Sequence, residues 1–525
     1  MRMCECEQRN RGADIRRAAS WKVAGLAAIV IGLALPAMSA QGSSQGLLLE
    51  QVRNLNEAMA RAQTQLEQSQ RQLDEIRKQM AALERELAQT EPGATPTPAP
   101  SASPAAAPSS AESASLEAIR EGQEVEESQI ATHEQTKVES ASKYPVKVTG
   151  MLLFNGFVNT GAVDMASTPT VAFPGSGSTG ATMRPTILGV DANGPRLFGA
   201  RSYADLRVDF NGSVAGNSAN SYAGFYSTNT GLLRLRTAHA GLQWEHTDAY
   251  FSLDRPIVSP DTPTSLTAVA EPALAWSGNL WTWNPQLGVR TEFGSRGPFG
   301  GLVEAALVDV GDPPQTPQMS SLPTLPSAAE QSRWPGVEGR VALLGSERDE
   351  ERSHLGLGGY FAPHHSSLGK DFDSWAATVD ARAFLPARLE LMGSGYRGAA
   401  LGGLGGGGYK DFAYRSDPDT GGYYLRPLDD VGGWAQLKER FNERFEMNAA
   451  LGMDNVFAGE LRRFAVPGGT VYQNLARNRS ATGNFIYRPS AYLLFSVEYR
   501  RLESFPLLSA PARSDVIGLG AGYRF

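Results

Sequence analysis

The stretch Arg201-Ser-Tyr-Ala-Asp-Leu-Arg-Val-Asp-Phe-Asn211 alternates between two kinds of side chain. Every second residue, from Ser202 to Phe210, is small or apolar, and the residues between them are charged or polar. Because successive side chains of a β-strand point to opposite faces, the pattern predicts one face suited to lipid and one suited to water. The stretch therefore favours a strand of a transmembrane barrel.

The same alternation recurs around residues 286–293, 374–383, 445–454 and 495–500. About 16 such segments follow Tyr144, separated by Gly, Pro, Asn and Asp turns. A closed barrel is the arrangement that satisfies every backbone polar group of strands in lipid. We therefore expect an all-β transmembrane barrel of about 16 antiparallel strands over residues 144–525.

The last segment carries a further signal. Ile517, Leu519, Ala521, Tyr523 and Phe525 alternate with three glycines and Arg524. This stripe resembles the C-terminal signal by which outer-membrane barrels are handed to their assembly machinery. We expect Tyr523 and Phe525 to form that signal, and we expect a Gram-negative-type outer membrane, its lipid and its barrel assembly machinery to be the surroundings and partners.

Three segments precede the predicted barrel. Residues 1–40 carry basic residues, an apolar run from Val23 to Leu35, and small residues after Pro36, which is the order of a secretory signal peptide. A membrane anchor is the alternative, although the run is short for one.

Residues 46–90 place apolar side chains at alternating steps of four and three from Leu48 to Leu87, broken at Ser69. This repeat predicts a periplasmic coiled coil and hence a homo-oligomer.

Residues 91–143 are rich in Pro and Ala at first and acidic afterwards, and they predict a linker.

The composition of the 525 residues excludes several classes of protein. With 48 basic and 55 acidic residues, a net charge of −7 gives no electrostatic case for nucleic acid. A mean hydropathy of −0.28 does not fit a bundle of membrane helices. Both cysteines, Cys4 and Cys6, precede the apolar run, so no disulfide, thiolate metal site or cofactor is predicted.

The cations of the predicted barrel are mostly arginines. Residues 144–525 hold 29 Arg and 4 Lys against 36 acidic residues. Arginine suits bidentate capture of a carboxylate or phosphate, so inward arginines predict a pore that favours small anionic solutes. The residues expected to line the pore and meet the solute are Arg201, Asp205, Arg207, Asp209, Arg234, Arg236, Arg290 and Arg382. Structural ion pairs across the inner wall are the alternative role for each of them.

Two local features need an explanation in such a barrel. If Arg234 and Arg236 point inward, strict alternation turns His239 toward lipid, which predicts a β-bulge near Ala238. The long segment 256–285 is expected to fold inward as a constriction loop. Its alternative is an outward surface loop whose Trp281 and Trp283 mark the aromatic girdle. Neither His239 nor His354 has an evident catalytic partner, so no enzyme is predicted.

The whole arrangement resembles the DcaP-like outer-membrane porins, in which a periplasmic coiled coil precedes a general-porin-like barrel. The resemblance rests on the heptads, Val146-Lys-Val-Thr-Gly-Met151, Arg234-Leu-Arg236 and Tyr523-Arg-Phe525. It implies a trimer with one pore per subunit and passive uptake of small anions such as dicarboxylates. Two functions remain open from the sequence: a porin, and a structural tether in which the coil reaches toward the cell wall and the barrel is an anchor.

Overall fold

The computed structural model describes residues 146–212, 232–294, 299–317, 326–348 and 351–525. The chain divides into two compact units, Met1–Ser110 and Ala111–Phe525, and every described residue belongs to the second. The predicted signal peptide (1–40), coiled coil (46–90) and linker (91–143) lie outside the described residues. The predictions made for them stay predictions.

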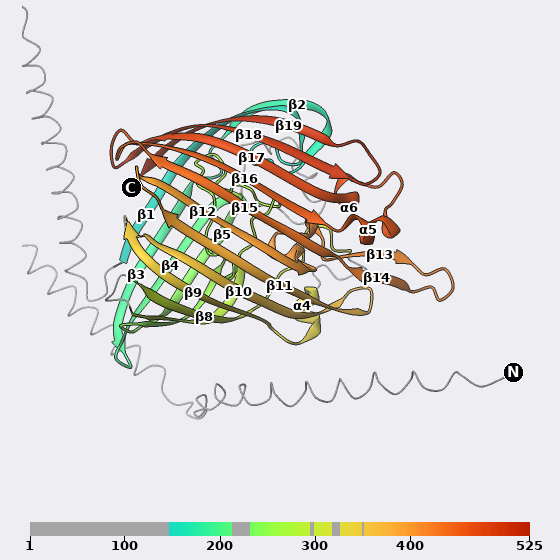
Figure 1. Cartoon of the computed structure of the whole chain (residues 1–525), viewed down its shortest axis with the longest axis horizontal. Helices are drawn as coiled ribbons and strands as arrows, with labels where there is room; N and C mark the ends of the chain where they lie inside the picture. The colour runs from blue at the N-terminus through green and yellow to red at the C-terminus, as the bar shows by residue number, and fades with distance from the viewer. Residues whose placement is uncertain (1–145, 213–231, 295–298, 318–325, 349–350) are drawn as a thin grey trace, which may run out of the picture. The chain divides into compact units, whose positions relative to one another are not determined.

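The second unit is a closed antiparallel β-barrel (Figure 1). Its wall begins with β1 Val146–Val163, β2 Ala172–Thr182, β3 Ile187–Leu197, β4 Ala200–Gly212, β5 Leu232–Gln243, β6 Thr247–Asp254, β7 Asn284–Phe293, β8 Gly300–Val308 and β9 Gly336–Arg348. It continues with β10 Glu351–Ser366, β11 Lys370–Phe384, β12 Leu389–Ala399, β15 Asp429–Arg440, β16 Phe445–Val456, β17 Leu475–Tyr487, β18 Leu493–Pro506 and β19 Ala512–Arg524. No helix among the described residues is long and apolar enough to span a membrane.

Strand β1 closes the barrel. One edge pairs with β19, and the other pairs with β3 through residues 146–151 and with β2 through residues 155–163. Strands β2 and β3 therefore occupy one position in the wall, and the 17 labelled segments fill 16 positions. This confirms the predicted closed barrel of about 16 antiparallel strands.

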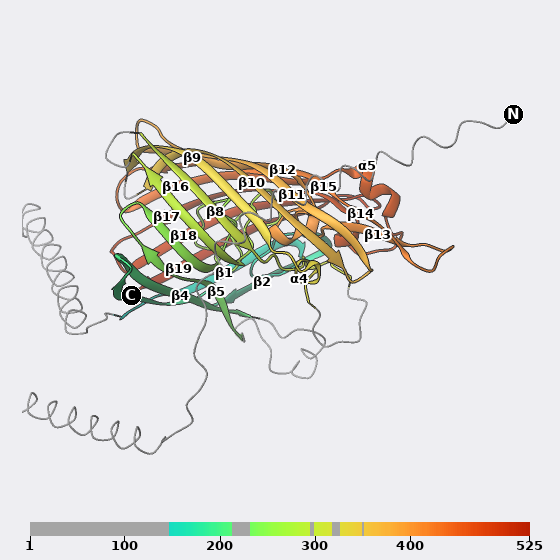
Figure 2. The ribbon, with the colours of Figure 1, turned by 90° about the horizontal axis from the view of Figure 1, so that it is seen from below.

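The two ends of the barrel differ in the length of their connections (Figures 1 and 2). At the end where β1 begins and β19 finishes, neighbouring strands are joined by short turns such as residues 198–199 and 488–492. We call this the short-turn end. The opposite, long-loop end carries connections such as 255–283 and 400–428. It also carries β13 Phe412–Ser416 and β14 Tyr423–Pro427, a separate hairpin, and the short helices α4 Ala328–Ser332, α5 Ala458–Leu461, η4 Arg462–Phe464 and α6 Val471–Asn474.

The wall has an apolar exterior and a polar interior. Leu451 on β16 and Leu519 on β19 keep 66% and 53% of their surface exposed on the outside. On the inner face, Asn448 of β16 and Glu498 of β18 are each only 2% exposed. This is the reverse of a soluble barrel and the arrangement expected of strands that face lipid. The alternation predicted from Arg201 to Asn211 therefore describes the wall correctly.

Strand β5 contains the predicted bulge, two residues earlier than expected. Arg207 of β4 pairs with Thr237, but the next residue, Val208, pairs with Leu235, so Arg236 is the extra residue. The shift returns His239 to the inner face, where its Nδ1 lies 2.9 Å from Asp205 Oδ1. The position near Ala238 was wrong because the alternation of side chains indicates that parity changes but not at which residue.

Two segments from the long-loop end fold into the barrel. Residues 255–283, here the inward loop, bury Val258, Leu266 and Leu280 to 5% exposure or less. Residues 400–411 contain η2 Gly402–Leu404 and η3 Gly407–Tyr409 and are buried throughout. The segments touch where Trp281 N donates to Leu404 O over 3.0 Å. The prediction of an inward loop is correct, and the alternative of an outward surface loop is wrong.

Candidate functional site

The inward loop is attached to the inner wall at several points around the barrel. Ile257 N donates to Glu338 Oε2 of β9 over 2.7 Å, and Thr264 N donates to Gln436 Oε1 of β15 over 2.6 Å. On the far side, Asn155 Nδ2 of β1 donates to Thr267 O over 3.0 Å. Since strands distant in sequence hold the same loop, its path across the lumen is fixed by side chains of the wall and not by the loop alone.

Arg234 and Arg236 hold the loop at β5. Arg234 donates through Nε and Nη2 to the two carboxylate oxygens of Asp209, over 3.0 and 2.7 Å, and Arg236 Nη1 donates to the same carboxylate over 3.1 Å. Both side chains also donate to backbone carbonyls of the loop, Arg234 to Ala270 and Arg236 to Val269, over 2.6 Å each. Asp209 is fully buried. The geometry therefore gives this pair the structural role that was the alternative at the sequence level.

Trp283 completes this cluster. The guanidinium carbons of Arg234 and Arg236 lie 5.0 and 4.9 Å from the centre of its ring. Cation–π attraction of this kind stabilises an arginine whose charge is already paired. Trp283 is thus part of the lumen, and Trp281 packs edge-on against it with ring centres 5.4 Å apart. The interpretation of these tryptophans as a girdle in the lipid interface is wrong, since both face the interior with the loop.

A second attachment involves His354 of β10. Its Nε2 lies 3.1 Å from Asp261 Oδ2 on the inward loop and 3.2 Å from Asp380 Oδ2 on β11. Arg382 Nη2 also donates to Asp261, over 2.8 Å, and its Nη1 lies 2.7 Å from Glu351. The ion-pair partners of His354 come from a neighbouring strand and from the loop, which no sequence spacing indicates. Arg382 faces the lumen as predicted, and its guanidinium group forms ion pairs with Asp261 and Glu351.

Between the loop and the wall lies a cavity of about 370 Å³. It is lined by Arg207, Arg236 and Arg255, by Trp281 and Trp283, by Ile187 and Thr237 of the wall, and by uncharged residues of the loop. No carboxylate is among the residues that line it. Arg255 donates to Pro260 O over 3.1 Å, and Arg207 donates to Asp191 over 2.6 Å. A solute in this cavity would meet three guanidinium groups and two aromatic rings.

A neighbouring cavity of about 320 Å³ shares Arg255 with the first. Its lining mixes signs: Arg290 and His239 face Asp248, Asp254 and Glu304. His239 is held between Asp205 and Asp254, with ring nitrogens 2.9 and 3.0 Å from the two carboxylates. Arg290 Nη2 donates to Glu292 over 2.7 Å. Arg255 therefore lines both cavities: the first, whose charged residues are all arginines, and the second, which also contains carboxylates.

Arg201, Asp205 and the remaining predicted residues occupy different levels of the lumen. Arg201 lies near the short-turn end, exposed, and donates to Gln243 Oε1 over 2.5 Å. Asp205, Arg207 and Asp209 continue along the inner face of β4. The structure thus brings Arg207 and Arg236 together in one cavity and places Arg201, Arg290 and Arg382 outside it.

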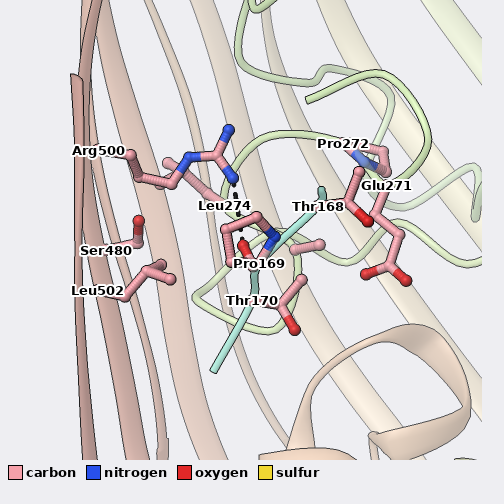
Figure 3. A pocket seen from close by; sticks show the side chains of 10 residues that line it. Thr168, Pro169, Thr170, Glu271, Pro272, Leu274, Ser480, Arg500 and Leu502 are labelled. Carbon is pink, nitrogen blue, oxygen red and sulfur yellow. Dashed lines mark hydrogen bonds between the residues drawn. The ribbon is translucent and has the colours of Figure 1, made fainter. Parts of the chain in front are cut away.

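A tight contact between two loops lies on the other side of the lumen (Figure 3). Arg500, from β18, donates through Nη1 to Pro169 O of the β1–β2 connection over 3.2 Å and through Nη2 to Glu498 over 2.6 Å. Glu271 of the inward loop lines the same small space, and its Oε2 has no hydrogen-bond partner within the described residues. With about 10 Å³ of free volume, this space holds loops together and does not admit a solute.

The C-terminal residues complete the wall at the short-turn end. Phe525 exchanges two backbone hydrogen bonds with Gly150 of β1, over 2.9 and 3.0 Å. Tyr523 and Phe525 are 47% and 46% exposed on the outer face. Both side chains therefore belong to the apolar exterior, on the strand that closes the barrel.

An apolar exterior, a polar lumen and an inward loop together define the architecture of outer-membrane channel proteins. The structure is similar to the outer-membrane channel DcaP of Acinetobacter baumannii, with a TM-score of 0.52, 16% sequence identity, and coverage of 73% of this chain and 99% of that chain. An anion-selective porin from Comamonas acidovorans matches with a TM-score of 0.40, 11% identity and coverage of 73% and 100%. OmpT of Vibrio cholerae, in its trimer form, matches with a TM-score of 0.40, 11% identity and the same coverage.

No protein-family model matches the sequence, and no curated protein matches it. The resemblance to DcaP-like porins predicted from the sequence is confirmed at the level of the fold. Sequence reasoning missed Arg255, Asp261 and Glu338 as residues of the lumen. Arg255 and Asp261 belong to a connection without alternation, so no periodic signal marks them. Glu338 lies on an alternating strand and was open to the same argument as Arg382.

Proposed function

We propose that this protein is an outer-membrane porin, a channel for passive diffusion of small solutes that favours anions such as carboxylates. The cavity between the inward loop and the wall is the observation that carries the proposal. Arg207, Arg236 and Arg255 line it without a carboxylate. In a confined space with little screening, such fixed charge attracts anions and repels cations.

The preference should be modest. Arg207 is paired with Asp191, and Arg236 shares Asp209 with Arg234, so part of the positive charge is neutralised at the wall. The side chain of Arg255 hydrogen-bonds to a backbone carbonyl, and the Asp254 carboxylate beside it offsets part of its charge. Solutes with a carboxylate that a guanidinium group can grip should gain most. Catalysis has no place in this proposal, nor does a metal or cofactor.

The experiment is the reversal potential of the purified full chain in a lipid bilayer under a potassium chloride gradient. The parent should prefer chloride, and Arg255→Gln should reduce that preference. Arg463→Gln removes the same charge from an exposed position in η4 at the long-loop end and is the matched control. A parent pore that prefers potassium would refute the anion preference. A barrel that does not conduct would favour the structural tether.

The assembly and location belong to the same proposal. We propose a Gram-negative-type outer membrane as the location, a homotrimer as the assembly, and Tyr523 with Phe525 as the signal read by the barrel assembly machinery. Support comes from the apolar exterior and from the place of Phe525 at the closing strand pair. Native mass measurement of the detergent-purified protein tests the trimer.

Phe525→Ser should lower the amount of protein in outer-membrane fractions several-fold, because it removes the terminal aromatic side chain of the apolar stripe. Leu508→Ser is the control, since Leu508 is a 50% exposed apolar residue between β18 and β19 at the long-loop end. Immunoblots of membrane fractions give the measurement. Equal amounts of both variants would contradict the assignment.

A further inference from the structure

The short-turn end of the lumen contains a basic cavity that the proposed constriction does not explain. Its volume is about 600 Å³, and it is lined by Arg348, Arg388, Arg440 and Arg488 together with three glutamates and Asn442. The four arginines come from the ends of β9 and β15 and from the turns that follow β11 and β17. Successive strand ends thus contribute guanidinium groups to one opening.

Two of the three glutamates of this cavity, Glu446 and Glu390, are already engaged in ion pairs. Arg488 Nη1 donates to Glu446 over 2.9 Å. Glu390 lies 3.7 Å from Arg382, 3.8 Å from Lys438 and 3.7 Å from Arg440. Because three cations share the carboxylate of Glu390, it does not neutralise the remaining arginines. The third glutamate, Glu443, makes no ion pair with Arg348 or Arg388 among the described residues.

Arg348 and Arg388 are the arginines left with uncompensated charge. Arg348 donates to the backbone carbonyls of Leu389 and Leu385, over 3.2 Å each, and so spans the turn between β11 and β12. The side chain of Arg388, in that turn, makes no hydrogen bond or ion pair with any residue the structure describes. The guanidinium groups of Arg348 and Arg388 therefore line the cavity beside one turn, and neither forms an ion pair with a carboxylate among the described residues.

The turn that carries Arg388 has a strained backbone. Ala387 and Arg388 are consecutive non-glycine residues in the left-handed region, with φ of 61° and 59°. Residues other than glycine strain the backbone in this region, and such strain concentrates at functional sites. Glycine or asparagine would form the same turn with less strain, but without the cation.

We propose that this cavity is a second anion-binding site, separate from the constriction, that takes small polyvalent anions through paired phosphate or carboxylate groups on Arg348 and Arg388. The proposal deepens the proposed porin function, on which it rests: an anion that has passed the constriction meets a second site at the opposite mouth from the long loops. Bidentate contact to guanidinium favours planar carboxylates and phosphates over halides.

Direct binding is the test, because it does not depend on conduction. The folded full chain in detergent is titrated with inorganic triphosphate in a calorimeter. The parent should bind, and Arg388→Asn should weaken binding about tenfold, as expected for the loss of one charge-assisted contact. Arg348→Gln combined with Arg388→Asn should weaken it further. Asparagine tolerates the left-handed backbone, so the single variant should fold, which a gel-shift assay of the heat-sensitive barrel verifies.

Arg463→Gln, with the same loss of charge at the long-loop end, should bind triphosphate like the parent. In bilayers, triphosphate should block the parent more strongly from one side, and Arg388→Asn should remove that asymmetry. Absence of binding to the parent, or equal binding by the parent and Arg388→Asn, would overturn the proposal. A parent that binds but does not conduct would overturn the porin function alone, and a parent that conducts but does not bind would overturn this site alone.

Discussion

The arginines beside the inward loop and those at the short-turn end line the same lumen, but their partners differ. Arg234 and Arg236 share the buried carboxylate of Asp209, donate to loop carbonyls and stack on Trp283. Among the described residues, Arg348 donates hydrogen bonds to backbone carbonyls and lies 4.9 Å from the centre of the Phe384 ring. Arg388 has no hydrogen-bond or ion-pair partner there. The first group therefore positions a loop, and the second leaves its charge available. Residue type alone does not separate these roles.

The structural role of the arginines beside the inward loop is tested most directly by a change at Asp209, their shared partner. Asp209→Ala leaves two partly buried guanidinium groups without their carboxylate, which should lower the free energy of unfolding by about 3 to 5 kcal/mol. Thermal unfolding of the detergent-solubilised protein, followed by gel shift, gives the measurement. Asp371→Ala, at a side chain that is 87% exposed, is the control and should shift the midpoint little. Equal midpoints for both variants would show that the cluster does not hold the loop.

The position of the loop can be tested without touching a charge. Gly278 has a φ of +101°, and a Cβ there would lie 2.1 Å from the carbonyl oxygen of Gly433 on β15. Gly278→Ala should therefore lift the loop from the wall, cost about 1 to 3 kcal/mol and raise the single-channel conductance. Gly459→Ala is the control, since no atom lies within 4 Å of its added Cβ. An unchanged conductance with lowered stability would separate the loop from control of the pore.

The smallest effect is expected at Arg201, whose exposed side chain hydrogen-bonds, within the described part of the chain, to Gln243 alone. Arg201→Gln should change stability by less than about 0.5 kcal/mol and leave the reversal potential close to that of the parent. Bilayer recordings beside Arg255→Gln test this directly. A shift as large as that of Arg255→Gln would mean that exposed charges at the mouth set selectivity as strongly as the cavity does.

Much of the wall could be predicted from the sequence because a strand in lipid imposes a period of two on its side chains. The same period predicted a bulge in β5, but it did not indicate that Arg236 would be the extra residue. The lumen was harder to predict. Asp261, His354 and Asp380 meet because a loop crosses the barrel, and alternation contains no information about such a crossing. Arg234 and Arg236 were correctly placed on the inner face, and their partner Asp209 lies opposite Arg234 on the neighbouring strand, so the ion pair was within reach of the sequence. Their hydrogen bonds to the loop carbonyls were not.

The β13–β14 hairpin offers a position at which a label can be inserted into the protein. Its two strands form five residue pairs in a sheet separate from the barrel wall, and it extends from the long-loop end in both views (Figures 1 and 2). At its base, Arg426 pairs with Glu460 of α5. Its tip is closed locally, with Gly421 N donating to Asp417 O over 3.0 Å and Asp419 N to Asp417 Oδ1 over 3.1 Å. A peptide epitope inserted after Asp419 would lengthen this tip without entering the hydrogen-bonded wall. The hairpin is therefore the natural place to attach a label for single-molecule tracking or an antibody tag in intact cells.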